Sequence, residues 1–447
     1  MRKLLFAVVA VLIITPFSGG QGATIDISEQ LTLNHCIKLA LEQSPSMRMA
    51  ALDLKTAEFD VADARSNYWP QINASGQYRF SEDIDFGWER QNYDASLNAS
   101  YTLWDHGRRE AGLAQARLNE QVVQSDYENS RQSLIFGVTE AYYALLEAEK
   151  LIDVNDKLLE ISKGNVEKVT AFQEAGRSIP ADVAAARVQQ ANDELAIINA
   201  QNNLELARAR LASLMGLDPG TPIGVVDEDA ALVSPDADRI FTLPVLLMQE
   251  VSLEDSLAEA MEKRPELARL RIRLASLEWS LKLARLDRWP VITAEYGYNV
   301  QLDDYLRDRD NFKEYRDWSA MARVSFPIFD GGVSKRREQS AEIALEQMKE
   351  SMIERERSIK LEVQQAYLNL ERAKKSLEIA KEQVTDATES LNVTLGRYEQ
   401  TMVIFLEVLS AQSRYAQALT NQIRAFYDLK ITQRALEKAV GTLKVED

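Results

Sequence analysis

The chain contains the same pattern twice, and this internal duplication restricts its possible folds more than any other feature. Residues 31–78 align without a gap with residues 251–298, at an offset of 220. Beyond the turn of each hairpin the offset becomes 225. The matched markers are Pro45 with Pro265, Trp69-Pro70 with Trp289-Pro290, and Trp104-Asp105-His106-Gly107 with Phe329-Asp330-Gly331-Gly332. A repeat of this length indicates one structural unit that the chain uses twice.

Between these markers, each copy carries two stretches in which polar and apolar residues alternate. The apolar positions are Ile72, Ala74, Gly76, Tyr78 and Phe80, then Tyr93, Ala95, Leu97, Ala99, Tyr101 and Leu103, and in the second copy Ile292, Ala294, Tyr296, Tyr298 and Val300, then Trp318, Ala320, Ala322, Val324 and Phe326. This period of two predicts strands at about 70–80, 92–104, 290–301 and 317–327, one hairpin per copy with an acidic turn at 81–91 in the first. About ten residues suffice for a tilted strand to cross a membrane. A soluble, half-buried antiparallel sheet fits the alternation equally well.

The rest of each copy predicts long helices. Residues 108–172 contain no proline, which predicts one helix of about 65 residues. The shorter helices at 46–68 and 181–215 are expected to stack end to end beside it. Leu134, Val138, Ala141 and Leu145 recur as Ile359, Val363, Ala366 and Leu370, which indicates a coiled-coil seam. We therefore divide the chain into repeats at 24–216 and 251–447, joined at the waist by a proline-containing linker at 217–250.

The first residues predict export from the cytoplasm. Arg2 and Lys3 precede an apolar run over 4–17 and then small residues, which is typical of a Sec signal peptide at 1–23. No later segment reaches eighteen uncharged apolar residues, so any membrane crossing is expected to be made by strands. The single cysteine, Cys36, allows no internal disulfide.

Charge and motifs argue against several functions. The formal net charge of -17 disfavours nucleic acid and anionic lipid surfaces as partners. His35 and His106 are the only histidines, and no metal-ligand spacing, nucleophile motif or phosphate-binding loop accompanies them. We therefore expect no enzyme, no metal and no cofactor. Asp105 is predicted to be the N-cap of the following helix, with His106 a solvated neighbour.

The strand count implies self-association if the strands lie in a membrane. Two hairpins give four strands, which are too few to close a barrel, and open strand edges cannot face lipid. Three chains would supply twelve strands, an even number within the observed range. The sequence permits three copies but does not fix that number.

Together these motifs resemble the TolC-like outer membrane efflux protein family over the whole mature chain. The resemblance rests on the Trp-Pro pairs, on the aromatic-Asp-x-Gly motifs at 104–107 and 329–332, and on the patterns at 175–183 and 407–411. It implies a mainly α-helical chain that trimerises into a 12-stranded outer-membrane β-barrel continuous with a periplasmic α-helical tunnel. The implied partners are a periplasmic adaptor, an inner-membrane pump of RND, ABC or MFS type, and outer-membrane lipid.

The implied function is the exit duct of a tripartite efflux or type I secretion system, with the substrate left open. The alternative is a secreted coiled-coil adhesin or a periplasmic scaffold without a pore. Aromatic residues near the ends of paired strands of membrane-spanning length favour the duct.

The resemblance also implies three sites. The barrel–tunnel junction comprises Trp69, Pro70, Asp105, Gly107, Trp289, Pro290, Asp330 and Gly332; the adaptor-docking tips comprise Gly176, Arg177, Ser178, Thr401, Met402 and Val403; the periplasmic gate comprises Glu407, Asp182 and Tyr398. Gly176 is expected to close a helix in the left-handed conformation, with Ser178 capping the next one.

Three residues depart from the family's pattern. Thr401 replaces a glycine, which puts the geometry of the second tip in doubt. Val403 replaces a tethering arginine and Ser410 replaces a second acid of the lumen, so we expect a weaker latch and one fewer carboxylate ring.

Overall fold

The computed structural model describes residues 31–83, 88–226, 252–302 and 316–443. The predicted signal peptide and most of the predicted linker lie outside these ranges. The first copy forms α1 (Leu33–Gln43), α2 (Pro45–Ser66), β1 (Gln71–Asp83), β2 (Trp88–Trp104), α3 (Arg108–Glu174) and α4 (Pro180–Leu214). The second forms α5 (Leu253–Lys263), α6 (Pro265–Leu286), β3 (Val291–Leu302), β4 (Arg316–Ser325), α7 (Val333–Glu399) and α8 (Phe405–Val440). The same six elements occur in the same order, so the predicted duplication is confirmed.

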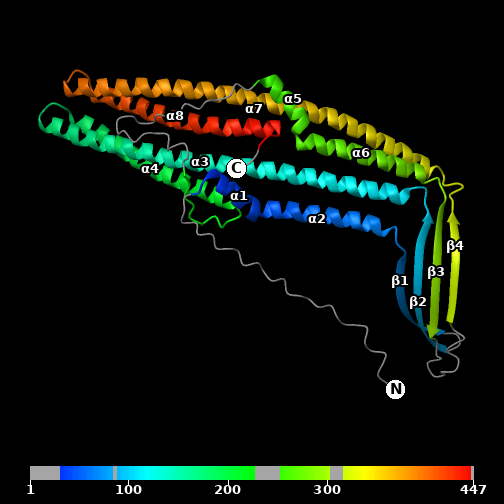
Figure 1. The fold of residues 1–447 in the computed structure, drawn as a ribbon. Coiled ribbons are helices and arrows are strands. Elements are labelled where there is room, and N and C mark those ends of the chain that lie inside the picture. Colours follow the sequence, from blue (N-terminus) through cyan, green and yellow to red (C-terminus); the bar gives the residue numbers. More distant parts are fainter. Residues whose placement is uncertain (1–30, 84–87, 227–251, 303–315, 444–447) are drawn as a thin grey trace.

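The molecule is long, with the sheet at one end and the α3–α4 and α7–α8 turns at the other (Figure 1). The helices α3 and α7 are 67 residues each, and α2 (22 residues) and α4 (35 residues) both pack along α3, as predicted. Near the sheet the helices lie side by side in the order α2, α3, α6, α7. Nearer the turns the order is α4, α3, α8, α7. One side of the layer therefore ends in α2 and α4, and the other ends in α7.

The predicted coiled-coil seam forms the core of these helices. Val138, Leu145, Ile359 and Val363 are completely buried. Most of the core lies at the waist, where α1 and the segment at Ile223 and Val225 pack against α3.

A break at a proline separates α1 from α2 and α5 from α6. Pro45 and Pro265 each stand at the first helical position, where the missing N–H costs nothing. The residue before each, Ser44 or Arg264, is extended, as a following proline favours. Gly216, at the end of α4, lies against the first break with φ +77°, and a Cβ there would come within 2.6 Å of the Gln43 carbonyl oxygen. This close approach explains why the chain has glycine there and at the matching Gly441.

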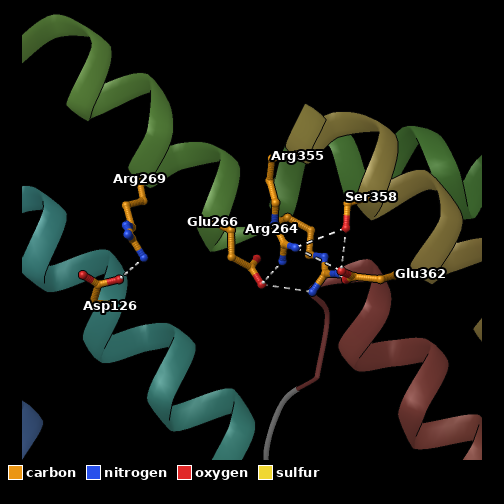
Figure 2. A network of polar contacts seen from close by, with 7 residues as sticks. All are labelled: Asp126, Arg264, Glu266, Arg269, Arg355, Ser358 and Glu362. Atoms are coloured by element: carbon orange, nitrogen blue, oxygen red, sulfur yellow. Dashed lines mark hydrogen bonds and ion pairs between the residues drawn. The ribbon is translucent and has the colours of Figure 1, made fainter. Parts of the chain in front are cut away.

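Figure 2 shows a polar network at the second break. Arg264, which is 6% exposed, donates to Glu266 (3.2 Å) and to Glu362 of α7. Arg355 donates to the same two carboxylates at 3.3 and 3.1 Å. The positions that correspond to these four residues in the first copy are Ser44, Ser46, Ser130 and Gly137. The two repeats are therefore held by different interactions at the waist.

The four strands form one antiparallel sheet in the order β1-β2-β3-β4. Ala74 pairs with Leu97 in the first hairpin, and Ala294 pairs with Ala322 in the second, so the register repeats at the offsets of 220 and 225. The predicted strands are confirmed, with three differences in length. Backbone pairing carries β1 to Asp83 and starts β2 at Trp88, inside the predicted turn. The strand β4 ends at Ser325, before the predicted end at 327, because Pro327 has no N–H to donate to a ladder.

Candidate functional site

The sheet has one apolar and one polar face, and the register carries each across all four strands. Ile72 pairs with Ala99, Ala99 with Tyr296, and Tyr296 with Ala320, which gives one continuous apolar row. Ser75, Ser96, Asn299 and Asp317 make a polar row in the same way. A register slip by one residue would mix the faces, so the pairing and the sequence pattern agree.

No helix of the described residues covers either face of this sheet (Figure 1). Ile72, Tyr78, Trp318 and Val324 are 56–68% exposed in the single chain. The edges formed by β1 and β4 are also unpaired in the single chain. An uncovered apolar face with open edges is incomplete as a soluble sheet, because water would contact both.

None of the helices that the structure describes is both long enough and apolar enough to span a membrane.

At the junction of sheet and helices, two aspartates hold the starts of the long helices. Asp105 accepts hydrogen bonds from the backbone N–H groups of Gly107 (3.2 Å) and Arg109 (3.1 Å). Asp330 accepts from Gly332 (2.9 Å) and Ser334 (2.8 Å) in the same geometry. The hydrogen bonds from Ser334 lower the pKa of Asp330 to about 2. The residue at the N-cap position itself is Gly107 or Gly332, at φ +87° or +83°. The prediction of Asp105 as the N-cap was therefore wrong by two residues, because the left-handed glycine lets the earlier carboxylate reach the first amides.

The prediction that His106 is solvated was also wrong. Its ring lies between Trp104 and Trp289, with centroid separations of 3.5 and 4.6 Å. The sheet pairs β2 with β3 and so brings the end of the first hairpin beside the start of the second. The corresponding residues at the edges of the sheet, Trp69 and Phe329, are 73% and 90% exposed.

At the other end of the molecule, the two helical turns have the same backbone geometry. In the first, Gly176 donates to Gln173 (2.9 Å) and Arg177 to Phe172 (2.7 Å). In the second, Thr401 donates to Tyr398 (2.9 Å) and Met402 to Arg397 (2.9 Å). This is the pattern of a Schellman motif, which needs a left-handed residue. Gly176 has φ +70° as predicted, and Thr401 adopts φ +61° despite its branched side chain.

The side chains at the tips differ from the prediction in one respect. The N-cap of α4 is Ile179, and Ser178 does not cap the helix but donates its hydroxyl to Asp182 (2.8 Å). Arg177 donates to the Glu399 carbonyl (2.8 Å), and Lys168 pairs with the Glu399 carboxylate (2.6 Å). These contacts join the two tips, and no local sequence pattern indicated them. Met402 and Ile404 are 64% exposed, whereas Phe405 is buried and Val403 is half-buried.

The three predicted gate residues lie in different environments. Glu407 is exposed in the first turn of α8, and Asp182 is half-buried in the first turn of α4. Tyr398 is buried between Phe172 and Phe405, at ring separations of 5.7 and 5.5 Å, and this burial raises its pKa. Its buried hydroxyl has no hydrogen-bond partner among the described residues.

Within the described ranges, no group of three or more His, Cys, Asp or Glu side chains is placed to hold a metal ion. Cys36 is buried in the waist, which raises the pKa of its thiol to about 12.

Comparison with known proteins agrees with this architecture. The family model described as "Outer membrane efflux protein" matches residues 36–217 and 257–442, once for each repeat. Protein CyaE of Bordetella pertussis is 26% identical over 428 residues, which cover 94% of this chain and 85% of the relative. Outer membrane protein TolC of Escherichia coli K12 is 24% identical over 432 residues, covering 94% and 84%. A crystal structure of CusC superimposes with a TM-score of 0.75 at 19% identity and covers 92% of both chains.

The fold and the two-faced sheet therefore define a subunit of an outer-membrane channel. The chain belongs to the outer membrane efflux protein family, whose model matches both repeats. It is an outer-membrane exit duct of the kind used in tripartite efflux or secretion, with its strands in the outer membrane and its helices in the periplasm.

Proposed function

We propose that three copies of this chain close into one passive duct, a 12-stranded barrel continuous with an α-helical tunnel. The duct carries cargo from an inner-membrane pump, through a periplasmic adaptor, across the outer membrane, and it performs no catalytic step. The observation that carries this proposal is that the sheet and the helical layer both end in unpartnered edges, and that these edges lie on the same two sides of the chain.

The open edges match one another from one copy to the next. The sheet ends in β1 and β4, and the helical layer ends in α2 and α4 on the side of β1 and in α7 on the side of β4. Large apolar residues are exposed on these edge helices: Phe59 on α2, Val188, Leu195 and Leu206 on α4, and Leu361, Leu368 and Val393 on α7, each at 53–70%. Packing α7 of one copy against α2 and α4 of the next would cover these residues.

The internal repeat predicts the register of the seam between copies. Inside one chain, the second strand of the first hairpin (β2) pairs with the first strand of the second hairpin (β3). The equivalent pairing between copies joins β4 of one copy to β1 of the next. Leu97 of β2 pairs with Tyr298 of β3. The residue of β4 that corresponds to Leu97 is Ala322, and the residue of β1 that corresponds to Tyr298 is Tyr78. The repeat therefore predicts that Ala322 of one copy lies opposite Tyr78 of the next. Ala99 with Tyr296 predicts Val324 opposite Gly76 in the same way. Both pairs join apolar positions and place a large side chain opposite a small one, as cross-strand packing favours.

A pair of cysteines tests this register. Within one chain β1 and β4 are separated by two strands, about 14 Å, so a disulfide between them can form only between copies. We expect Tyr78→Cys with Ala322→Cys to give covalent trimers on mild oxidation in membranes. The matched control, Ala74→Cys with Ala322→Cys, is displaced by four residues, about 13 Å, and should stay uncross-linked. Equal cross-linking of both pairs, or of neither, would contradict the seam.

We propose further that the tips dock the adaptor and that Glu407 lines the closed mouth. Arg177 and Met402 are exposed at the tips, and the exposed side chains of Met402, Ile404 and Leu406 have no covering element in the described chain. Cysteines at Arg177 and Met402 should capture the adaptor in cells with a bifunctional cross-linker. Capture at mid-helix control positions such as Lys375, but not at the tips, would disprove docking there.

A further inference from the structure

A group of cations lies where the second repeat passes from helices to sheet. Lys282, Arg285 and Arg288 are near the end of α6, and Lys335, Arg336 and Arg337 are at the start of α7; we call these six residues the basic collar. All six side chains are exposed. The segments 282–288 and 333–337 contain these six cations and one acid, Asp287, in a chain whose net charge is -17. The corresponding segments of the first repeat, 62–68 and 108–112, have three cations and two acids.

The three cations on α7 occupy a position that the helix itself disfavours. The start of a helix is the positive end of its dipole, where acids are stabilising and cations are not. The first turn of α7 contains no acid, whereas the first turn of α3 contains Glu110. Asp330 caps this end and offsets only part of the charge. The start of α7 is therefore a place where an anion would be stabilised.

The contacts of the collar within the chain leave it accessible. Arg285 and Arg288 pair with Glu338 at 3.0 and 2.7 Å, and Arg337 pairs with Asp287 at 3.1 Å, but their side chains stay 55%, 52% and 65% exposed. Exposed pairs of this kind are weak and easily exchanged. Lys335 makes no hydrogen bond or ion pair to any of the described residues.

Between the collar and the strands lies a belt of exposed apolar side chains. Ile328 and Phe329 are 90% exposed, Phe326 is 55% exposed and Trp289 is 52% exposed. Trp289 immediately precedes Pro290 and β3, and Phe326 follows the end of β4. Aromatic side chains of this kind mark the boundary between the apolar and polar regions of a membrane. The collar thus follows the belt on the helical side, at the depth of lipid headgroups.

We propose that the basic collar binds the anionic headgroups of phospholipids in the leaflet that faces the periplasm. The proposal rests on the orientation of the barrel under the proposed function. Cations directly beyond an aromatic belt attract anionic lipid, and the attraction acts within about a Debye length. The net charge of -17 disfavours anionic lipid as a partner of the chain as a whole. That net charge sums over all residues and so hides this local group of cations. Bound lipid would place an anion at the positive end of α7 and would fix the depth of the barrel.

Native mass spectrometry of the protein released from vesicles tests the proposal. The vesicles contain phosphatidylcholine with added phosphatidylglycerol, and the spectrum reports both the number of chains and the lipids retained. We expect wild-type trimers to retain phosphatidylglycerol in preference to phosphatidylcholine. The variant Lys335→Gln, Arg336→Gln, Arg337→Gln should lower that preference at least about fivefold, the effect of losing one headgroup contact. The matched control Lys349→Gln, Lys360→Gln, Lys375→Gln removes three exposed cations of the same helix far from the sheet and should retain the preference.

The outcomes separate this proposal from the proposed duct. Trimers that retain both lipids equally, or an equal loss in both variants, would overturn lipid binding alone. Loss of trimers in the wild type would instead overturn the duct. If the collar faced the lumen instead, the triple variant would change ion selectivity in planar bilayers and keep its preference for phosphatidylglycerol. That result would also overturn the proposal.

Discussion

Thr401 lies in a backbone conformation that threonine rarely adopts, so Thr401→Gly should stabilise the second tip. Its φ of +61° is in the left-handed region, which costs a residue with a Cβ roughly 1–2 kcal/mol. Its side chain is exposed, and its hydroxyl donates only to the adjacent Gln400 carbonyl, so little packing is lost. Glycine gives back about 0.4–1 kcal/mol through the greater freedom of the unfolded chain. The net gain is therefore about 0.5–1 kcal/mol per chain.

Hydrogen–deuterium exchange at the end of α7 measures this gain, because local opening exposes the amides that the turn protects. The amide of Met402, which donates to Arg397, should exchange roughly two- to fivefold more slowly in Thr401→Gly. The reciprocal change Gly176→Thr places the same strain in the first tip, so the amide of Arg177 should exchange faster by a similar factor. Faster exchange in Thr401→Gly, or unchanged exchange in Gly176→Thr, would refute the strain.

Three further predictions follow from the sheet, the mouth and the junction. Arginine at Ala99 or Ala322, on the apolar face, should cost roughly 2–4 kcal/mol of barrel stability, while arginine at Ser100 or Thr293, on the polar face, should be tolerated. Equal losses of stability on the two faces, measured by unfolding from lipid vesicles, would refute the assignment of the faces. Glu407→Gln should reduce cation selectivity and block by multivalent cations in planar bilayers, whereas Glu250→Gln should not; unchanged selectivity would place Glu407 outside the pore. Asp330→Asn should lower the stability of the start of α7. The pKa of Asp330 falls from 3.8 to about 2 on folding. The difference in stability between wild type and variant should therefore be complete above pH 3.8 and vanish as the pH falls through 2. A difference in thermal stability that persists below pH 2 would assign the effect to something other than the charge of Asp330.

The repeated elements were predictable because their signals are local. Alternation of period two gave the strands and their faces, and the absence of proline over 108–172 gave the length of α3. The registers of the two hairpins are related by the same offsets that align the two halves of the chain. Gly176 was predictable because a left-handed helix end requires its freedom, whereas Thr401 shows that the turn geometry is set by the repeat and not by the residue at that position.

Contacts between distant segments could not be read from local patterns. His106 is enclosed by Trp289 only because β2 pairs with β3, and the sequence says nothing of that pairing directly. The network around Arg264 joins residues 98 positions apart, and its counterpart in the first repeat is uncharged, so the duplication gave no indication of it. The bond from Arg177 to Glu399 joins the two tips across 222 positions for the same reason. The gate at Glu407, Asp182 and Tyr398 stays a prediction, because its function depends on neighbouring copies.

Single-particle electron cryomicroscopy of the purified assembly would show how the copies close into one duct. We expect three chains around one axis, with twelve strands closed into a barrel and β4 of each copy paired with β1 of the next, Ala322 opposite Tyr78. A different number of chains, a sheet that stays open, or a seam in another register would contradict it.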